Sequence, residues 1–122
     1  MSDIRHEEHL KFQYNVDINT IIIESKNNMK KLNYKKAFEI LKLPIIQGVK
    51  HSDIFYLFGE VNRILKQYEN SEKYLLEALM FEMHSPYVFY SLGLLYQEIN
   101  NYKESVKMFK HFIQIIVNCI FI

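Results

Sequence analysis

The chain has 122 residues, 49% of them hydrophobic and 24% charged, which is typical of one small globular domain. Its 15 basic residues balance 14 acidic ones, and only Arg5 and Arg63 are arginines, so the composition argues against a nucleic-acid partner. The single cysteine, Cys119, excludes an internal disulfide and favours a reducing, cytoplasmic location.

Residues 1–16 are expected to form an N-terminal arm, flexible or docked as a helix on the residues that follow. Their apolar positions fit two patterns. Leu10, Phe12, Tyr14 and Val16 alternate as in a strand, whereas Leu10, Tyr14 and Ile18 share one helical face. The charged residues near the start are not followed by an apolar stretch, so no secretory signal is evident.

The arm also contains the sequence His6-Glu7-Glu8-His9, which resembles a metal-binding motif at first sight. The helical zinc motif of metalloproteases needs histidines four residues apart, whereas these are three apart and lack a third ligand nearby. We therefore predict a solvated polar stretch and no metal site.

A 34-residue spacing repeats from residue 18 to residue 119 without any gap. Three sets of residues carry it: the tyrosines Tyr34, Tyr68 and Tyr102, the small residues Ser25, Gly59 and Gly93, and the small residues Ala37, Ser71 and Ser105. Such a period is the signature of a repeat architecture. It predicts three units, 18–51, 52–85 and 86–119, with 120–122 as the start of a truncated fourth unit or an apolar tail.

Each unit is expected to contain two helices. In the third unit Ser85 is a suitable N-cap, Pro86 fits the first helical position, and Asn101 with Glu104 resembles a capping box for the next helix. The apolar residues expected on the buried faces of the two complete units are Phe55, Phe58, Leu65, Leu75, Ala78 and Leu79, then Phe89, Leu92, Tyr96, Val106, Phe109, Phe112 and Ile113. In the first unit, Pro44 predicts that the second helix stops or kinks near Leu43.

These features resemble the tetratricopeptide repeat family. Its pattern is a large aromatic, Leu-Gly, an aromatic, a small residue, an aromatic and an alanine, and the third unit has Phe89, Leu92-Gly93, Tyr96, Ser105, Phe109 and Phe112 at these places. The middle unit has Phe55, Phe58-Gly59, Ser71, Leu75 and Ala78. The first unit departs from the pattern with Glu24, Ser25 and Asn28. The resemblance implies an all-α fold in which the small residues permit close helix contact and the pairs stack as a short right-handed α-solenoid.

The resemblance also implies that partners bind in a concave groove formed by the first helix of each unit. The predicted groove residues are Ile22, Lys26, Met29, Asp53, Tyr56, Glu60, Arg63, Tyr87, Tyr90, Leu94 and Gln97. Some of the tyrosines could instead pack between helices. One subfamily binds chaperone C-termini through a clamp of Lys, Asn and Arg, but the matching positions here are Ile22, Lys26, Leu57, Tyr87 and Ser91. We therefore expect no docking of a free carboxylate.

No pattern of catalytic residues is present, and we predict no enzymatic activity, cofactor or metal. Cys119 lies in an apolar run without basic neighbours, so we expect a buried structural thiol. Three functions stay open: an adaptor or scaffold that binds a partner peptide or helix, a structural segment of a larger solenoid within an assembly, and a regulatory peptide-sensing module.

The last eight residues, 115–122, carry no charge and are rich in β-branched side chains, a composition typical of aggregation-prone segments. The apolar run from Phe112 to Ile122 is too short to span a bilayer. We therefore expect that the chain is a fragment of a longer array, or that this tail is buried by self-association or by a partner.

Overall fold

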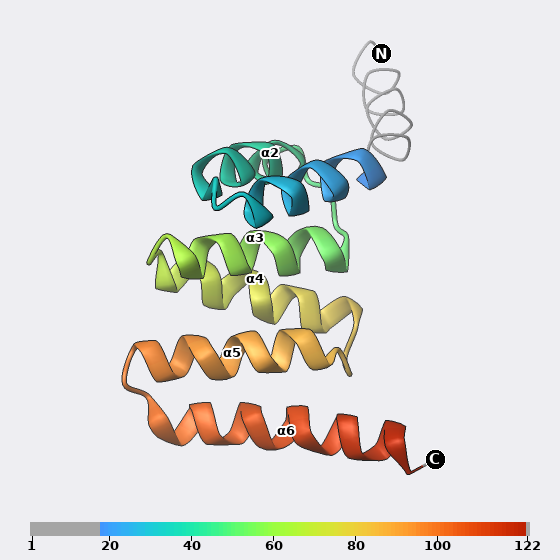
Figure 1. Ribbon diagram of the computed structural model, residues 1–122, viewed down its shortest axis with the longest axis vertical. Coiled ribbons are helices and arrows are strands. Elements are labelled where there is room, and N and C mark those ends of the chain that lie inside the picture. Colours follow the sequence, from blue (N-terminus) through green and yellow to red (C-terminus); the bar gives the residue numbers. More distant parts are fainter. Residues whose placement is uncertain (1–17, 122) are drawn as a thin grey trace.

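The computed structural model describes residues 18–121, and within this range the regular structure is entirely helical. After the helical residues 18–30 come α2 (Tyr34–Ile46), α3 (Ser52–Ile64), α4 (Tyr68–Phe81), α5 (Pro86–Glu98) and α6 (Tyr102–Ile120). Successive helices run antiparallel and stack along one axis (Figure 1). Ser52 and Pro86, the first residues of α3 and α5, are 34 positions apart. The predicted all-α solenoid is therefore confirmed, whereas the arm of residues 1–16, with its four-residue histidine motif, lies outside the described residues.

The turn inside each helix pair has the same backbone conformation. A residue with positive φ recurs at intervals of 34 residues: φ is 62° at Leu32, 63° at Lys66 and 65° at Asn100. After each of them, the next backbone N–H donates to a carbonyl five residues earlier, over 2.8 Å in all three turns. This is the Schellman arrangement, which satisfies the last carbonyls of a helix but usually places glycine in the left-handed position. None of these three residues is glycine, so each turn holds some backbone strain.

Small residues allow the two helices of a pair to approach closely. A Cβ atom on Gly59 would lie 2.7 Å from the side chain of Leu75, and one on Gly93 would lie 2.5 Å from that of Phe109. The hydroxyl groups of Ser71 and Ser105 donate to the carbonyls of Gly59 and Gly93, both over 2.8 Å. The predicted close contact at the two glycines is thus confirmed, and each serine adds a buried hydrogen bond across it.

The core is continuous along the stack. One cluster of buried side chains joins the first two helix pairs and consists of Ala37, Leu41, Ile54, Leu57, Phe58 and Val61. The second joins the last two pairs and consists of Phe55, Leu75, Ala78, Val88, Leu92, Leu95 and Tyr96. Ile45, Tyr56 and Tyr74 pack against both clusters, so no gap separates the units. Burial of one helix face by the next unit is what stabilises a solenoid.

The burial predicted for α6 is wrong in part. Val106 and Ile113 were expected on its buried face, yet they are 51% and 56% exposed, and Ser105 is the buried residue of this helix. Cys119, predicted to be buried, is exposed as well. The cause is the same for all three, because among the described residues only α5 packs on α6.

Three local predictions need correction or refinement. α2 does not stop near Leu43 but continues through the buried Pro44 to Ile46, since a proline near the end of a helix removes only one hydrogen bond. Ser85 precedes α5 as predicted, with Pro86 in the first turn, but its side chain makes no capping hydrogen bond. Asn101 does cap α6 by accepting from the backbone N–H of Glu104.

Candidate functional site

One face of the solenoid is formed by the helices that come first in each pair. Residues 18–30, α3 and α5 lie on this face, with α6 beside α5 at its lower end (Figure 1). The face is hollowed between the first two of these helices and α5 by a pocket of about 530 Å³. The lining residues are Lys26, Met29, Lys30, Ser52, Asp53, Tyr56, Leu57, Ala78, Glu82, Ser85, Tyr87 and Val88.

Five of the eleven predicted groove residues line this pocket. Lys26 and Met29 come from residues 18–30, Asp53 and Tyr56 from α3, and Tyr87 from α5. Three segments that are distant in sequence thus contribute to one cavity. Helical spacing of three or four residues places each of the two pairs on one face of its helix.

Two aromatic side chains in the lining of the pocket contact each other. The rings of Tyr56 and Tyr87 are 6.3 Å apart between centroids and inclined by 50°, within the range of a favourable aromatic contact. Tyr87 is 69% exposed, whereas Tyr56 is half-buried and packs against both core clusters. Tyr87 is therefore the side chain of this pair that is free to contact a partner, and Tyr56 supports it from below.

The environment of Tyr56 keeps its phenol protonated. Burial raises the pKa of this group above its ordinary value, and the nearby carboxylate of Glu60 raises it further. A hydrogen bond with Ser91 and the positive charge of Arg63 act in the opposite direction without cancelling the effect. The phenol is thus a neutral hydrogen-bonding group in the wall of the pocket at physiological pH.

Charges of both signs line the pocket. Lys26 and Lys30 lie one helical turn apart on residues 18–30, while Asp53 lies in the first turn of α3 and Glu82 follows α4. Among residues 18–121 the ion pairs of the fold involve other side chains, so none of these four charges is neutralised there. The pocket therefore offers a partner two ammonium groups and two carboxylates in addition to the side chains of Tyr56 and Tyr87.

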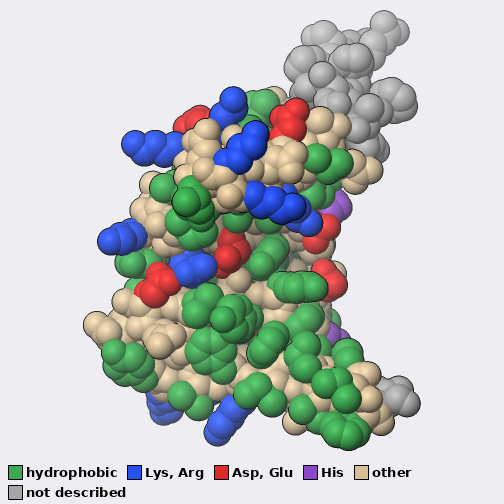
Figure 2. All heavy atoms as spheres, viewed as in Figure 1, with side chains coloured by type: hydrophobic (Ala, Val, Ile, Leu, Met, Phe, Trp, Pro, Cys, Tyr) green, Lys and Arg blue, Asp and Glu red, His purple; other side chains and the backbone are tan. Residues whose placement is uncertain are grey.

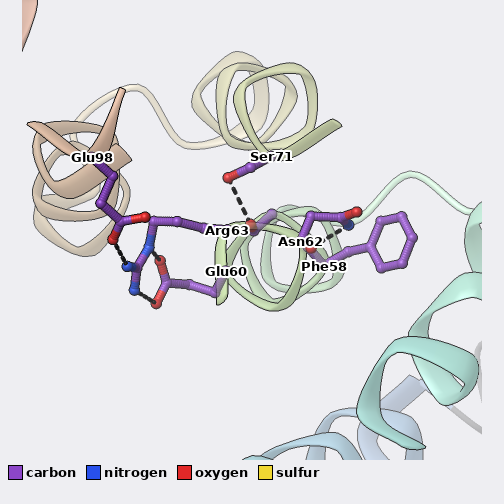
Figure 3. Close-up of polar contacts among 7 residues, drawn as sticks. Phe58, Glu60, Asn62, Arg63, Ser71 and Glu98 are labelled. Atoms are coloured by element: carbon purple, nitrogen blue, oxygen red, sulfur yellow. Dashed lines mark hydrogen bonds and ion pairs between the residues drawn. The ribbon is translucent and has the colours of Figure 1, made fainter. Parts of the chain in front are cut away.

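Two further predicted groove residues, Glu60 and Arg63, form an ion-pair network outside the pocket. The guanidinium of Arg63 donates to both carboxylate oxygens of Glu60, over 3.0 and 3.1 Å, and to Glu98 of α5, over 2.5 Å. Figure 3 shows Arg63 held between the two carboxylates, while Ser71 and Asn62 point elsewhere. Burial acts to lower the pKa of Arg63, but the two carboxylates outweigh it and raise the pKa, so the group stays charged. These side chains connect two units, and their charges already pair with one another.

The remaining predicted groove residues do not reach the pocket. Ile22 is half-buried and packs against the first core cluster. Tyr90 is 45% exposed and lies over Phe109 and Phe112 of α6, with centroid distances of 5.7 and 5.3 Å. Leu94 and Gln97 follow at helical spacing on α5. The lower part of the face is consequently apolar, as Figure 2 shows, whereas charges gather on its upper part.

Two charged residues of the pocket, Lys30 and Glu82, are not among the predicted groove residues. Lys30 lies four residues after Lys26, so its place on the same helical face could have been read from spacing alone. Glu82 follows α4 and belongs to the connection between two units. A rule that takes only the first helix of each unit cannot find it.

The described residues hold no group of three or more histidine, cysteine or acidic side chains arranged for a metal ion. The imidazole of His51 has a structural role that was not expected, because its Nδ1 atom accepts from the backbone N–H of Asp53 and caps α3. Within residues 18–121, no helix combines the length and the apolar character needed to cross a membrane.

Comparisons with known proteins agree with this geometry. No curated protein sequence matches the chain. The sequence model of the tetratricopeptide repeat matches residues 52–82 and 86–116, together just over half of the chain. The fold defines the class, an α-solenoid of stacked helix pairs, and the sequence match defines the family: the chain belongs to the tetratricopeptide repeat family.

Several solved structures share this fold. The crystal structure of MamA has a TM-score of 0.75 at 19% identity, and the match covers 92% of this chain and 66% of MamA. The second repeat domain of Spaghetti (RPAP3), bound to the HSP90 peptide SRMEEVD, has a TM-score of 0.77 at 14% identity, covering 90% and 96%. The Yersinia enterocolitica type III secretion translocator chaperone SycD has a TM-score of 0.76 at 13% identity, covering 84% and 77%. The chain thus spans slightly less than two thirds of MamA.

Proposed function

We propose that this chain is an adaptor that binds a segment of a partner protein in the pocket between residues 18–30, α3 and α5, and that it catalyses no reaction. The observation that carries the proposal is the pocket itself, in which four separate segments bring together an aromatic pair and four charges that form no ion pair among residues 18–121. The RPAP3 domain, which shares the fold, is described with a bound peptide and supports this class of function.

The lining of the pocket specifies the chemistry of the segment that would fit. An aromatic or large aliphatic side chain would lie on Tyr87, since exposed tyrosines often anchor interfaces. A carboxylate of the segment would meet Lys26 and Lys30, and a basic residue would meet Asp53 and Glu82. Opposite charges at a binding site add specificity and accelerate association. The expected ligand therefore combines acidic, basic and apolar side chains.

A free C-terminal carboxylate is not part of this proposal. The clamp positions of the carboxylate-binding subfamily are occupied here by Ile22, Leu57, Tyr87 and Ser91, besides Lys26. Leu57 is buried and Ile22 packs in the core, so neither could donate a hydrogen bond to a terminal carboxylate. The bound segment should thus be internal to the partner's sequence, and amidation of a peptide ligand should leave its affinity unchanged.

Selection of peptides from a random displayed library, with the 122-residue chain as bait, tests the proposal directly. The selected sequences should share an apolar residue together with an acidic and a basic one. Replacing both Lys26 and Lys30 by Glu should exchange the selected acidic position for a basic one, because the wall of the pocket changes sign. If the same sequences are selected by both chains, the pocket is not the binding site.

Affinity measurements with one selected peptide provide the second test. Tyr87→Ala should weaken binding by about tenfold or more, the effect of losing an aromatic anchor. Tyr102→Ala is the matched control, because Tyr102 is 60% exposed but lies at the start of α6, away from the pocket lining. Equal losses in the two variants would contradict the assigned site.

One observation favours a second function, that of a structural segment within a larger assembly. The aliphatic side chains of α6 are exposed over much of its length. In a larger solenoid such a face is covered by a neighbouring unit. A cytoplasmic location and a lack of nucleic-acid binding belong to both proposals and rest on the free thiol of Cys119 and on the balanced charge.

A further inference from the structure

α6 carries an exposed aliphatic stripe that is separate from the pocket. It consists of Val106, Ile113, Val117 and Ile120, which are 51%, 56%, 39% and 68% exposed. The position on α4 that corresponds to Ile113 is covered: Leu79, 34 residues earlier, packs against the core cluster that includes residues of α5. α5 packs on α4 from the following unit, whereas among the described residues no following helix packs on α6.

The stripe is symmetric about its central residue. Val106 and Ile120 each lie seven residues from Ile113, while Phe109 and Val117 each lie four residues from it. A two-fold axis through Ile113 and perpendicular to the helix would place Val106 against Ile120 of a second copy, and Phe109 against Val117. Two-fold interfaces require this kind of self-complementary surface. A spacing of seven residues also keeps side chains on the seam between two packed helices.

The charges of α6 favour one orientation of such a pair. Its first half carries Lys103, Lys107 and Lys110 against one acidic residue, Glu104, which pairs with Lys107, whereas residues 112–121 contain no charged side chain and the last turn has no basic residue. The C-terminal carbonyl groups of a helix carry partial negative charge that a nearby cation stabilises. Antiparallel pairing would bring the lysines of each copy to the C-terminal half of the other, while parallel pairing would place lysines beside lysines.

From this symmetry and charge distribution we propose that two copies of the chain pair through α6, antiparallel and centred on Ile113. The buried seam would consist of the stripe together with Phe109, and the stem of Lys110 would cover Ile116 of the other copy. The pocket between residues 18–30, α3 and α5 takes no part, so the dimer would carry two separate binding sites. The pairing does not depend on the proposed peptide function.

Sedimentation velocity of the 122-residue chain over a range of concentrations tests the pairing. The expected mass is twice the 14.8 kDa of one chain. Ile113→Asp should shift the dissociation constant upward by about tenfold or more, because it places two carboxylates on the two-fold axis. Gln114→Asp introduces the same charge at the next exposed position, off the stripe, and should leave the dimer intact. Helical circular dichroism of both variants checks that each is folded.

Two results would overturn the proposal: a parent chain that stays monomeric at concentrations of several hundred micromolar, or equal weakening by the two aspartate variants. A monomer that forms a one-to-one complex with an amphipathic helix from another protein would assign the stripe to that partner instead.

Disulfide trapping tests the orientation. Cys119 lies six residues from the proposed axis, about 9 Å along the helix, so the two Cys119 residues of an antiparallel pair would be about 18 Å apart. That separation exceeds the roughly 7 Å that a disulfide tolerates between Cα atoms. Mild oxidation should therefore leave the parent uncrosslinked but should crosslink Ile113→Cys in a Cys119→Ser background. Efficient crosslinking of the parent through Cys119 would show a parallel pair and contradict the proposal.

Discussion

Arg63 of α3 and Glu98 of α5 form an ion pair between two repeat units, while the same guanidinium holds Glu60 within its own helix. The three side chains differ in exposure: those of Arg63 and Glu60 are only 13% and 14% exposed, and that of Glu98 is 35% exposed. Removing one partner of an ion pair destabilises the fold more when the remaining charge is shielded from solvent. Replacing Arg63 should therefore lower the free energy of unfolding more than replacing Glu98.

Arg63→Ala should therefore lower the free energy of unfolding by about 1–3 kcal/mol, since it leaves the shielded carboxylate of Glu60 without its partner. Glu98→Gln should cost less than about 1 kcal/mol, because a partly exposed pair is screened by solvent. Chemical denaturation measures both. Lys107→Ala removes an exposed pair with Glu104 on α6 and serves as the control, with little expected change. A loss at Lys107 as large as that at Arg63 would contradict the ranking.

The two buried glycines should respond differently to a methyl group. A Cβ on Gly59 would meet both the side chain and, at 3.2 Å, the backbone nitrogen of Leu75, whereas one on Gly93 would meet the ring of Phe109. Phe109 is only half-buried and can move, but the α4 backbone cannot. Gly59→Ala should thus destabilise by about 1–3 kcal/mol, against a gain in helix propensity of about 1 kcal/mol.

Gly93→Ala should cost less, and both leucine variants should cost more than the alanine ones. Thermal unfolding of the four variants beside the parent provides the comparison. A Gly59→Ala variant that melts above the parent would mean that α3 and α4 are farther apart than the structure places them.

The repeating part of the fold was predictable because residues of the same type recur at a fixed spacing along the sequence. The 34-residue intervals of tyrosines and glycines place both helices of each unit, and small residues at fixed places identify the close contacts. Burial on α6 was not predictable in the same way. Ile113 corresponds to Leu79, which is covered on α4, but the exposure of Ile113 depends on whether another helix packs on α6, which helical spacing cannot reveal.

The candidate site was predictable only in part. Helical spacing identified Tyr87 and Lys26, because they lie on the first helix of a unit. It could not separate them from Tyr90, whose ring rests on Phe109 and Phe112, since that contact depends on how α5 and α6 pack. It also missed Glu82, which lies between units. Contacts between side chains that depend on tertiary packing could not be predicted from helical spacing.

The hydrogen bond between the phenol of Tyr96 and the carboxylate of Glu72 predicts a loss of stability at high pH. Its length is 2.7 Å, and burial, followed by the effects of Glu72, raises the pKa of Tyr96 well above its ordinary value of 10.0. The folded state therefore holds this proton more tightly than the unfolded state. The stabilisation is fully present below pH 10 and is lost as the pH rises above it.

Tyr96→Phe should be less stable than the parent at neutral pH by about 1–2 kcal/mol, since it removes a hydrogen bond to a charged group. Its stability should also fall less steeply than that of the parent above pH 10. Urea denaturation at several pH values between 8 and 11.5 measures both effects. Tyr102→Phe, which removes an exposed phenol on α6, is the control and should follow the parent. Parallel profiles for the parent and Tyr96→Phe would exclude Tyr96 as the titrating group.

The left-handed turns offer a substitution that should stabilise the fold. Lys66 has a φ of 63° and is exposed, so its side chain contributes little packing while its Cβ atom adds strain. Glycine adopts this conformation without that strain, although it loses more entropy on folding. Lys66→Gly should therefore raise the free energy of unfolding by about 0.5–1 kcal/mol. Lys31→Gly, at an exposed residue where φ is not positive, is the matched control and should lower it. Thermal and urea unfolding of the two variants give the sign, and a lower stability for Lys66→Gly would show that this turn stores no strain that glycine can relieve.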